Sequence, residues 1–261
     1  MSGSAKQVRL DRLLANMGYG SRKDIQMLVK AGRVRLDGKP LGDAGERIPV
    51  ASDLSQRMTI SGEPLDPPPG IVLIMHKPLG VTCSHKEAGP LVYQLLPPRW
   101  RARKPAISTI GRLDKETSGL LLLTDDGAML HRAIAPKSKV AKRYLARLAR
   151  PLRGDEAEVL ASGTLMLEGE TKPLLPVEME IAPVADCGNP LVADDGAIGP
   201  IVAVTLMEGR YHQVRRMFAA LGNHVAALHR DRFGGLRRTL QASVRHFDKV
   251  ARHEAIDGMD R

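Results

Sequence analysis

The sequence predicts an α+β protein with a small N-terminal domain and a larger domain, the latter built on a largely antiparallel mixed sheet with flanking helices and a central cleft. The first 60 residues combine two short helical patterns with a hairpin pattern. A segment rich in proline and glycine follows at residues 61–70, where neither a helix nor a central strand can continue. Downstream, strand-like runs outnumber helical ones without regular alternation, which favours an antiparallel sheet over repeated βα units.

The N-terminal domain is expected at residues 8–61. Apolar residues recur at helical spacing over residues 8–17, and Ser21 is placed to cap a second helix that carries Ile25, Leu28 and Val29. Gly32 ends that helix. Residues 33–36 then alternate polar and apolar side chains before Asp37-Gly38, a pair typical of a two-residue hairpin turn.

The second domain is expected at residues 71–236, after a linker at 62–70. Strand patterns occur at 71–75, 107–110, 120–124, 144–148, 177–181 and 201–206. Helical patterns occur at 129–135, 155–162 and 212–221, and the stretch rich in Gly and Asp at 186–199 is typical of a loop. We expect the basic tail at 237–261 to be disordered.

Composition narrows the class of partner. The chain has 261 residues and a formal net charge of +10, from 39 Lys and Arg against 29 Asp and Glu, which favours a polyanion such as nucleic acid. Charge alone still leaves open a basic protein that binds nothing. Cys83 and Cys187 show no metal-ligand spacing, and no apolar run approaches the length of a membrane span, so we expect reduced thiols, no membrane association and a cytoplasmic protein.

Two segments concentrate polar residues beside apolar ones. Residues 111–127, GRLDKETSGLLLLTDDG, place Asp114 on a polar turn directly before a buried strand. An isolated Asp in such a turn most often accepts backbone N–H bonds, so the turn by itself does not indicate catalysis. The second segment, EGRYHQVRRM at 208–217, opens an amphipathic helix on which Arg215 and Arg216 point in different directions, so that one can reach a buried carboxylate while the other meets RNA.

Together these two segments resemble the motifs of pseudouridine synthases. The continuation MFAALGNHV at 217–225 and LHR at 228–230 is similar to the RsuA-type enzymes that act on small-subunit ribosomal RNA, and Lys77-Pro78 and Lys142-Arg143-Tyr144 also match. The N-terminal region, with RLDRLL at 9–14, SRK at 21–23 and GRVRLDGK at 32–39, resembles the small alpha-L RNA-binding domain of a small-subunit ribosomal protein. The C-terminal tail of the chain, from residue 237 onward, departs from the acidic ending that is usual in the RsuA-type enzymes.

The resemblance implies the roles of particular residues. Asp114 would be the essential carboxylate, Tyr144 the aromatic residue against the target base, and Arg215 the cation paired with Asp114. Carboxylate attack on the substrate and removal of a sugar proton both remain open. RNA-binding roles are expected for a larger set: Arg22, Lys23, Arg33, Arg35, Lys77, Arg112, Lys142, Arg210, Gln213 and Arg216.

The same resemblance implies the reaction and its partner. Uridine isomerisation needs no cofactor, and His212, His224 and His229 lack the neighbouring ligands of a metal site, so we expect neither cofactor nor metal. The expected substrate is 16S ribosomal RNA, with uridine 516 as the best candidate, within a partly assembled small subunit, and we expect a monomer. The alternatives are 23S ribosomal RNA or transfer RNA as the target, and a non-catalytic RNA-binding factor for ribosome assembly.

Overall fold

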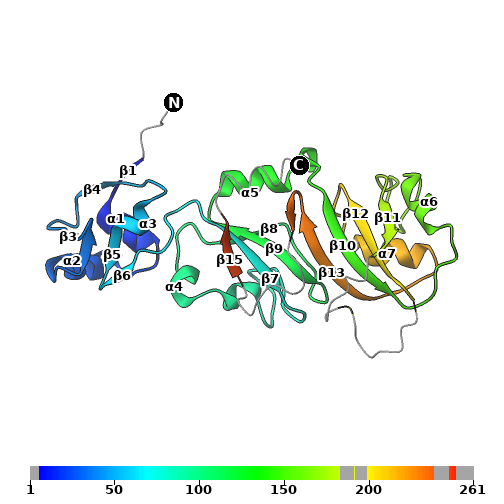
Figure 1. The fold of residues 1–261 in the computed structure, drawn as a ribbon, viewed down its shortest axis with the longest axis horizontal. Helices are drawn as coiled ribbons and strands as arrows, with labels where there is room; N and C mark the ends of the chain where they lie inside the picture. The colour runs from blue at the N-terminus through cyan, green and yellow to red at the C-terminus, as the bar shows by residue number, and fades with distance from the viewer. Residues whose placement is uncertain (1–5, 183–190, 192–198, 238–246, 251–261) are drawn as a thin grey trace. The chain divides into compact units, whose positions relative to one another are not determined.

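The computed structural model describes residues 6–182, 191, 199–237 and 247–250 (Figure 1). The described chain forms two compact units that are not consecutive blocks of sequence. The first contains residues up to 72 together with 93–108 and 124–127, and the second contains the remaining described residues.

In the first unit, two helices lead the fold as the sequence predicts. They are α1 (Leu10–Asn16) and α2 (Arg22–Lys30). Ser21 caps α2 reciprocally, because its hydroxyl accepts the Asp24 N–H at 3.2 Å while its own N–H donates to the Asp24 carboxylate at 2.7 Å. The apolar faces of both helices are buried in one cluster with Ile48, Leu54 and Met58.

Two small antiparallel sheets complete the N-terminal part of this unit. β1 (Gln7–Arg9) pairs with β4 (Arg47–Pro49), and β2 (Val34–Leu36), β3 (Lys39–Pro40), β5 (Met58–Ile60) and β6 (Glu63–Pro64) form a sheet in the order β3-β2-β5-β6. Asp37 and Gly38 both have positive φ, 50° and 77°, as the predicted hairpin turn requires. The short helix α3 (Leu54–Arg57) precedes β5.

Later segments of the chain return to the first unit. Helix α4 (Pro98–Arg101) buries Trp100, and Arg103 forms an ion pair at 3.0 Å with Asp125, with both side chains buried. Asp125 also accepts the N–H groups of Gly70 and Ile71, at 2.7 and 3.0 Å. The end of the Pro- and Gly-rich segment is therefore fixed by a buried carboxylate.

The second unit is built on a nine-stranded mixed sheet, which confirms the predicted fold class. Its order is β11-β12-β10-β13-β9-β7-β15, with β14 also paired to β13 and β8 to β9. β10 is antiparallel to both β12 and β13, whereas β13 and β9 run parallel. The strands are β7 (Val72–Lys77), β8 (Ser108–Ile110), β9 (Ser118–Thr124), β10 (Lys142–Leu148), β11 (Glu178–Ile181), β12 (Ile201–Leu206), β13 (Val225–Phe233) and β14 (Leu236–Arg237).

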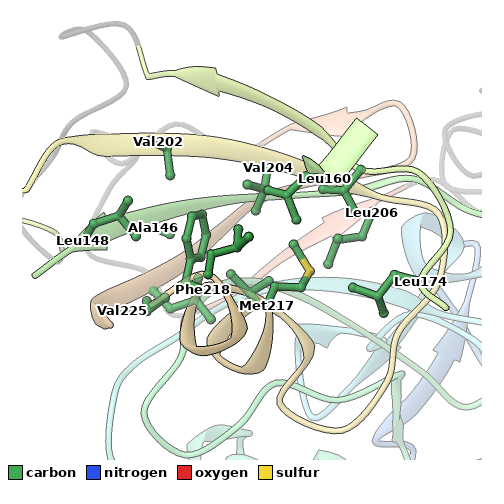
Figure 2. Packing of buried hydrophobic residues seen from close by; sticks show 14 of the residues in the cluster. Ala146, Leu148, Leu160, Leu174, Val202, Val204, Leu206, Met217, Phe218 and Val225 are labelled. Carbon is green, nitrogen blue, oxygen red and sulfur yellow. The ribbon is translucent and has the colours of Figure 1, made fainter. Parts of the chain in front are cut away.

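Helices cover this sheet and close its main core. They are α5 (Gly127–Ile134), α6 (Glu156–Ala161) and α7 (Gln213–Ala220), with a short 3-10 turn at Pro136–Ser138, while a second 3-10 turn, Val92–Leu95, lies mostly in the first unit. Val214, Met217 and Phe218 of α7 lie one turn apart and are all buried. Figure 2 shows Met217 and Phe218 packed toward the strand residues Val204 and Ala146. This packing fixes the start of α7.

The C-terminal tail differs in part from the expectation of disorder. Residues Phe247–Val250 form strand β15 beside β7. An edge strand exposes unpaired backbone N–H and C=O groups, and pairing with β15 satisfies those of β7. Residues 238–246 and 251–261 lie outside the described part, as does most of the predicted 186–199 loop. None of the described helices has the length and apolar character to cross a membrane.

Candidate active site

Asp114 lies on a tight turn between β8 and β9. Its carbonyl accepts the Thr117 N–H at 3.0 Å, which closes the turn, and its carboxylate is partly exposed, at 35%. The strand that follows is buried at every position. The fold therefore anchors the backbone of the turn while leaving the acidic group open to solvent.

Lys77 stabilises this turn from beneath. Its side chain is completely buried, and its ammonium donates to the carbonyls of Thr117, Pro78 and Lys115 at 2.8, 3.0 and 3.2 Å. Burial lowers the pKa of Lys77 from its usual value. The predicted contact between Lys77 and RNA is wrong, because the turn's own carbonyl groups use the ammonium.

The Arg215 side chain also binds a backbone carbonyl group of the turn. Its guanidinium donates to the carbonyls of Glu116 and Val225, both at 2.8 Å. The predicted ion pair between Arg215 and Asp114 is therefore not formed in this structure. Since Lys77 and Arg215 together hold the carbonyls of three consecutive residues, 115, 116 and 117, they fix the direction in which Asp114 points.

The His212 side chain is a close neighbour of the Asp114 carboxylate. Its Nε2 lies 3.5 Å from Asp114 Oδ1, and both side chains are partly exposed. His212 precedes α7 in the left-handed conformation, with φ 48°. A protonated His212 would form an ion pair with the carboxylate, and a neutral one would be placed to donate or accept a proton.

Close contact between β9 and β13 brings Arg230 to the same place. Gly119 pairs with Arg230 in the parallel ladder and has φ 114°, and a Cβ there would lie 2.2 Å from the Arg230 carbonyl oxygen. Only glycine permits this approach. The Arg230 guanidinium then donates from Nε to the Leu120 carbonyl at 2.9 Å.

Tyr144 and Arg230 meet on neighbouring strands. Arg230 Nη1 lies 3.5 Å from the Tyr144 hydroxyl, and the guanidinium carbon lies 5.9 Å from the Tyr144 ring and 5.2 Å from the Phe233 ring. Arg230 is almost wholly buried, and its Nη2 has no hydrogen-bond partner among the described residues. A buried cation with a spare donor group is costly unless a ligand or water meets it.

These side chains line one cavity of about 1000 Å³, which is large for a ligand site and sufficient for a nucleotide. Asp114, Tyr144, His212 and Arg230 all contribute to its wall. The wall carries seven cationic side chains against three carboxylates, so it favours a polyanion. The cations are Arg112, Lys115, Lys139, Lys142, Lys172, Arg210 and Arg230.

Three of the predicted RNA-binding cations lie at this wall, Arg112, Lys142 and Arg210, and the first two are in different states. Arg112 is exposed and pairs with Glu87 at 2.9 Å. Lys142 donates to the Val140 carbonyl at 2.7 Å, and its pKa is lowered by burial and then by the like charge of Arg230. Both side chains line the cavity, and their contact with RNA stays a prediction.

Arg210 and two other predicted RNA-binding residues have internal partners instead. Arg210 donates to the carbonyls of Lys172 and Pro173, and Arg216 pairs with Glu170 at 2.9 Å. Gln213 is buried; its side-chain oxygen accepts the Arg210 N–H at 2.8 Å and its amide donates to Glu208 at 3.1 Å. Arg210 and Arg216 therefore clamp the segment 168–173 onto the start of α7, and the prediction that Arg216 faces RNA is not supported by these contacts.

In the first unit, the predicted RNA-binding residues are all exposed. Arg22 is held by the buried Asp11, at 2.7 Å, and side-chain hydrogen bonds from arginine lower the pKa of Asp11 to about 2. Arg35 donates to the Gly38 carbonyl at 3.2 Å. Lys23 and Arg33 complete the exposed set, so this unit presents cations on α2 and on the start of β2.

Sequence reasoning missed Arg230, Tyr211 and Phe233, and it considered His212 only as a metal ligand. Arg230 is brought to the cavity by a parallel register between strands more than 100 residues apart, which no local pattern reveals. Two signals were available in the sequence: LHR at 228–230, which contains Arg230, and the position of Tyr211 and His212 directly before α7.

The basic cavity combines a backbone-anchored carboxylate, a tyrosine and a buried arginine, and comparisons with known proteins show the class of enzyme that carries it. Residues 71–220 match the family model for RNA pseudouridylate synthase, and residues 8–54 match the S4 domain model. The chain therefore belongs to the RNA pseudouridylate synthase family, a family of isomerases, and carries an S4 RNA-binding domain.

Individual relatives are similar to this chain over most of its length. An uncharacterized RNA pseudouridine synthase, YtzG of Bacillus subtilis, is 39% identical, over 85% of this chain and 86% of its own. Ribosomal small subunit pseudouridine synthase A of Escherichia coli K12 is 34% identical, over 91% and 93% of the two chains. A crystal structure described as a pseudouridylate synthase superposes with a TM-score of 0.60 at 30% identity, covering 96% of this chain and 99% of that one.

Proposed function

We propose that this chain isomerises a uridine of small-subunit ribosomal RNA to pseudouridine, with Asp114 as the catalytic carboxylate. The observation that carries this proposal is the Asp114 turn, held at three consecutive carbonyls and open to a basic cavity that also contains Tyr144 and Arg230. Such a turn fixes the carboxylate before substrate arrives, which is what an efficient catalytic group requires.

The reaction is an isomerisation, so substrate and product have the same composition. The bond between N1 of uracil and C1′ of ribose breaks, the base turns, C5 bonds to C1′, and the C5 proton is lost as N1 gains one. No electron is gained or lost, so side chains alone suffice. Asp114 either bonds covalently to the substrate or removes a sugar proton, and a carboxylate group can serve both routes.

Tyr144 and Arg230 act on the base. A uracil taken out of its stack loses the contact of its neighbours, and the Tyr144 ring replaces one of them. Arg230 lies within 3.5 Å of the Tyr144 hydroxyl and orients it. Arg215 and Lys77 are positioning residues, since they hold the turn by its carbonyl groups and do not contact the Asp114 carboxylate.

The finer assignment of the target is part of this proposal. It rests on the relative in E. coli whose name specifies the ribosomal small subunit, and on the 217–230 sequence. We propose uridine 516 of 16S ribosomal RNA, modified on a partly assembled small subunit by a cytoplasmic monomer. The exposed cations of the S4 domain, Lys23 and Arg33 among them, supply phosphate contacts that position the enzyme.

A deletion strain tests the target. Pseudouridine is mapped in its ribosomal and transfer RNA, then again after complementation with the wild-type gene or with Asp114→Asn. We expect one site to be lost from 16S RNA and restored by the wild type alone. Loss at a 23S or transfer RNA site would overturn the target, and loss at no site would support the non-catalytic alternative.

A further inference from the structure

Tyr211 stands out because its aromatic ring is exposed at a cavity edge. Its side chain is 77% exposed, whereas Tyr19, Tyr93 and Tyr144 are all half-buried. It lines the same cavity as Asp114. Neither the packing of the core nor the roles proposed above account for an aromatic ring held in this position.

One face of the Tyr211 ring is already occupied. The ring stacks on the His212 imidazole, with centroids 4.0 Å apart and an interplanar angle of 13°. His212 Nε2 in turn lies 3.5 Å from Asp114 Oδ1. Because so much of Tyr211 is exposed, the other face of its ring is available to a ligand. Only the His212 imidazole lies between the Tyr211 ring and the Asp114 carboxylate.

The backbone beneath this pair is fixed. The Tyr211 carbonyl accepts from Arg216 at 3.2 Å, and Arg216 is also paired with Glu170. On the other side, Arg210 is bonded to the 172–173 carbonyls and to Glu208 at 3.1 Å. A platform held on both sides loses little conformational freedom when a ligand binds.

We propose that Tyr211 is a stacking platform for an unpaired nucleobase of the substrate RNA, a neighbour of the target uridine. This inference rests on the function proposed above, since the target must be everted from its stack. Eversion leaves adjacent bases without a stacking partner, and a flat ring beside the cavity supplies one. The exposed cation Lys172, at the same cavity wall, suits a phosphate beside such a base.

If Tyr211 stacks on this base, the enzyme should have only a weak preference for the identity of the base next to the target uridine. Stacking uses the π-face that every base has, in contrast to hydrogen bonds that read base edges. Removal of the ring should weaken RNA binding by about 5- to 100-fold, the usual range for one stacked base. The rate once RNA is bound should change little.

The test uses the full-length enzyme and ribosomal RNA labelled with tritium at C5 of uracil, taken from a strain that lacks the gene. Tritium release gives kcat and KM for Tyr211→Ala, Tyr211→Phe and Tyr211→Trp, with Ile181→Ala as a control because Ile181 is 68% exposed and lies outside the cavity wall. We expect Tyr211→Ala to raise KM by about 5- to 100-fold and to keep kcat within about twofold. The two aromatic variants and the control should resemble the wild type.

Three results would overturn the platform: an unchanged KM in Tyr211→Ala, a loss of kcat alone, which would indicate action through His212, and failure of both aromatic variants to restore KM. A binding measurement separates this inference from the proposed function. In the Asp114→Asn background, filter binding of the same RNA should still weaken when Tyr211→Ala is added. Full activity of Asp114→Asn would refute the catalytic role of Asp114 without removing that binding effect.

Discussion

Replacement of Lys77 by methionine separates the structural role of this lysine from an RNA contact. The variant keeps the length of the side chain and removes an ammonium that makes three hydrogen bonds of 2.8 to 3.2 Å in a fully buried site. The Lys115 carbonyl keeps a second donor, the Gly80 N–H at 3.0 Å, whereas the Thr117 carbonyl loses the ammonium bond.

The expected loss of stability follows from these bonds. A hydrogen bond to a charged group contributes about 1.5–3 kcal/mol, and a buried acceptor left unsatisfied costs about 1–3 kcal/mol. Part of this loss is offset because a buried ammonium is itself costly. We therefore expect the free energy of unfolding to fall by about 2–4 kcal/mol.

The assay combines urea unfolding with kinetics at a temperature where both proteins are folded. Because the turn that carries Asp114 loosens, we expect kcat to fall at least about tenfold, while KM for RNA changes less than about threefold because Lys77 is inaccessible. Lys86→Met, at an exposed lysine, is the control. A variant with normal stability and kcat but a raised KM would refute this reasoning and return Lys77 to the RNA-binding surface.

Three further predictions concern the strands around the site. Gly119→Ala should lower the free energy of unfolding in urea by about 3 kcal/mol or more, because its Cβ would lie 2.2 Å from the Arg230 carbonyl oxygen and φ is 114°. Gly127→Ala is the control, because its Cβ would have nothing within 4 Å, and it should change that free energy by less than about 0.5 kcal/mol. Equal effects of the two variants would contradict the close approach of β9 and β13. Arg230→Lys should lower the single-turnover rate about 10- to 100-fold, since one ammonium cannot hold both the Leu120 carbonyl and the Tyr144 hydroxyl, and a wild-type rate would remove Arg230 from the site. Burial lowers the pKa of His229 from 6.5 to about 3, so below pH 6.5 the unfolded chain binds a proton that the folded chain does not. The free energy of unfolding should therefore fall by up to about 1.4 kcal/mol per pH unit between pH 6.5 and 3. His229→Gln should show a shallower fall over pH 7 to 4.5, and an identical slope would argue against a buried neutral imidazole.

Local chemistry made much of the fold predictable. Ser21 caps its helix, Asp37-Gly38 turns its hairpin, and the apolar run after Asp114 is a buried strand, each because the conformation depends on residues only a few positions apart. The fold class followed from the same patterns. The sequence also predicts correctly that Asp114 lies on a turn directly before a buried strand.

Non-local contacts defeated the rest of the site prediction. Lys77 was expected to contact RNA, but two of its three acceptors, the Lys115 and Thr117 carbonyls, lie 38 and 40 residues away on the Asp114 turn. Adjacent positions on α7 likewise do not reveal that Arg215 reaches the Glu116 carbonyl while Arg216 reaches Glu170. Such partners depend on strand register and on loop closure, and charge patterns in the sequence carry neither.

Tritium release from C5-labelled 16S RNA by Asp114→Asn tests the catalytic assignment most directly. Substitution by asparagine keeps the size of the side chain and removes its charge, and Asp155→Asn, at an exposed carboxylate outside the cavity wall, is the matched control. We expect no release above background from the Asp114 variant, with folding and RNA binding retained, and a normal rate from the control. Release by Asp114→Asn at the wild-type rate would contradict the central role given to this carboxylate.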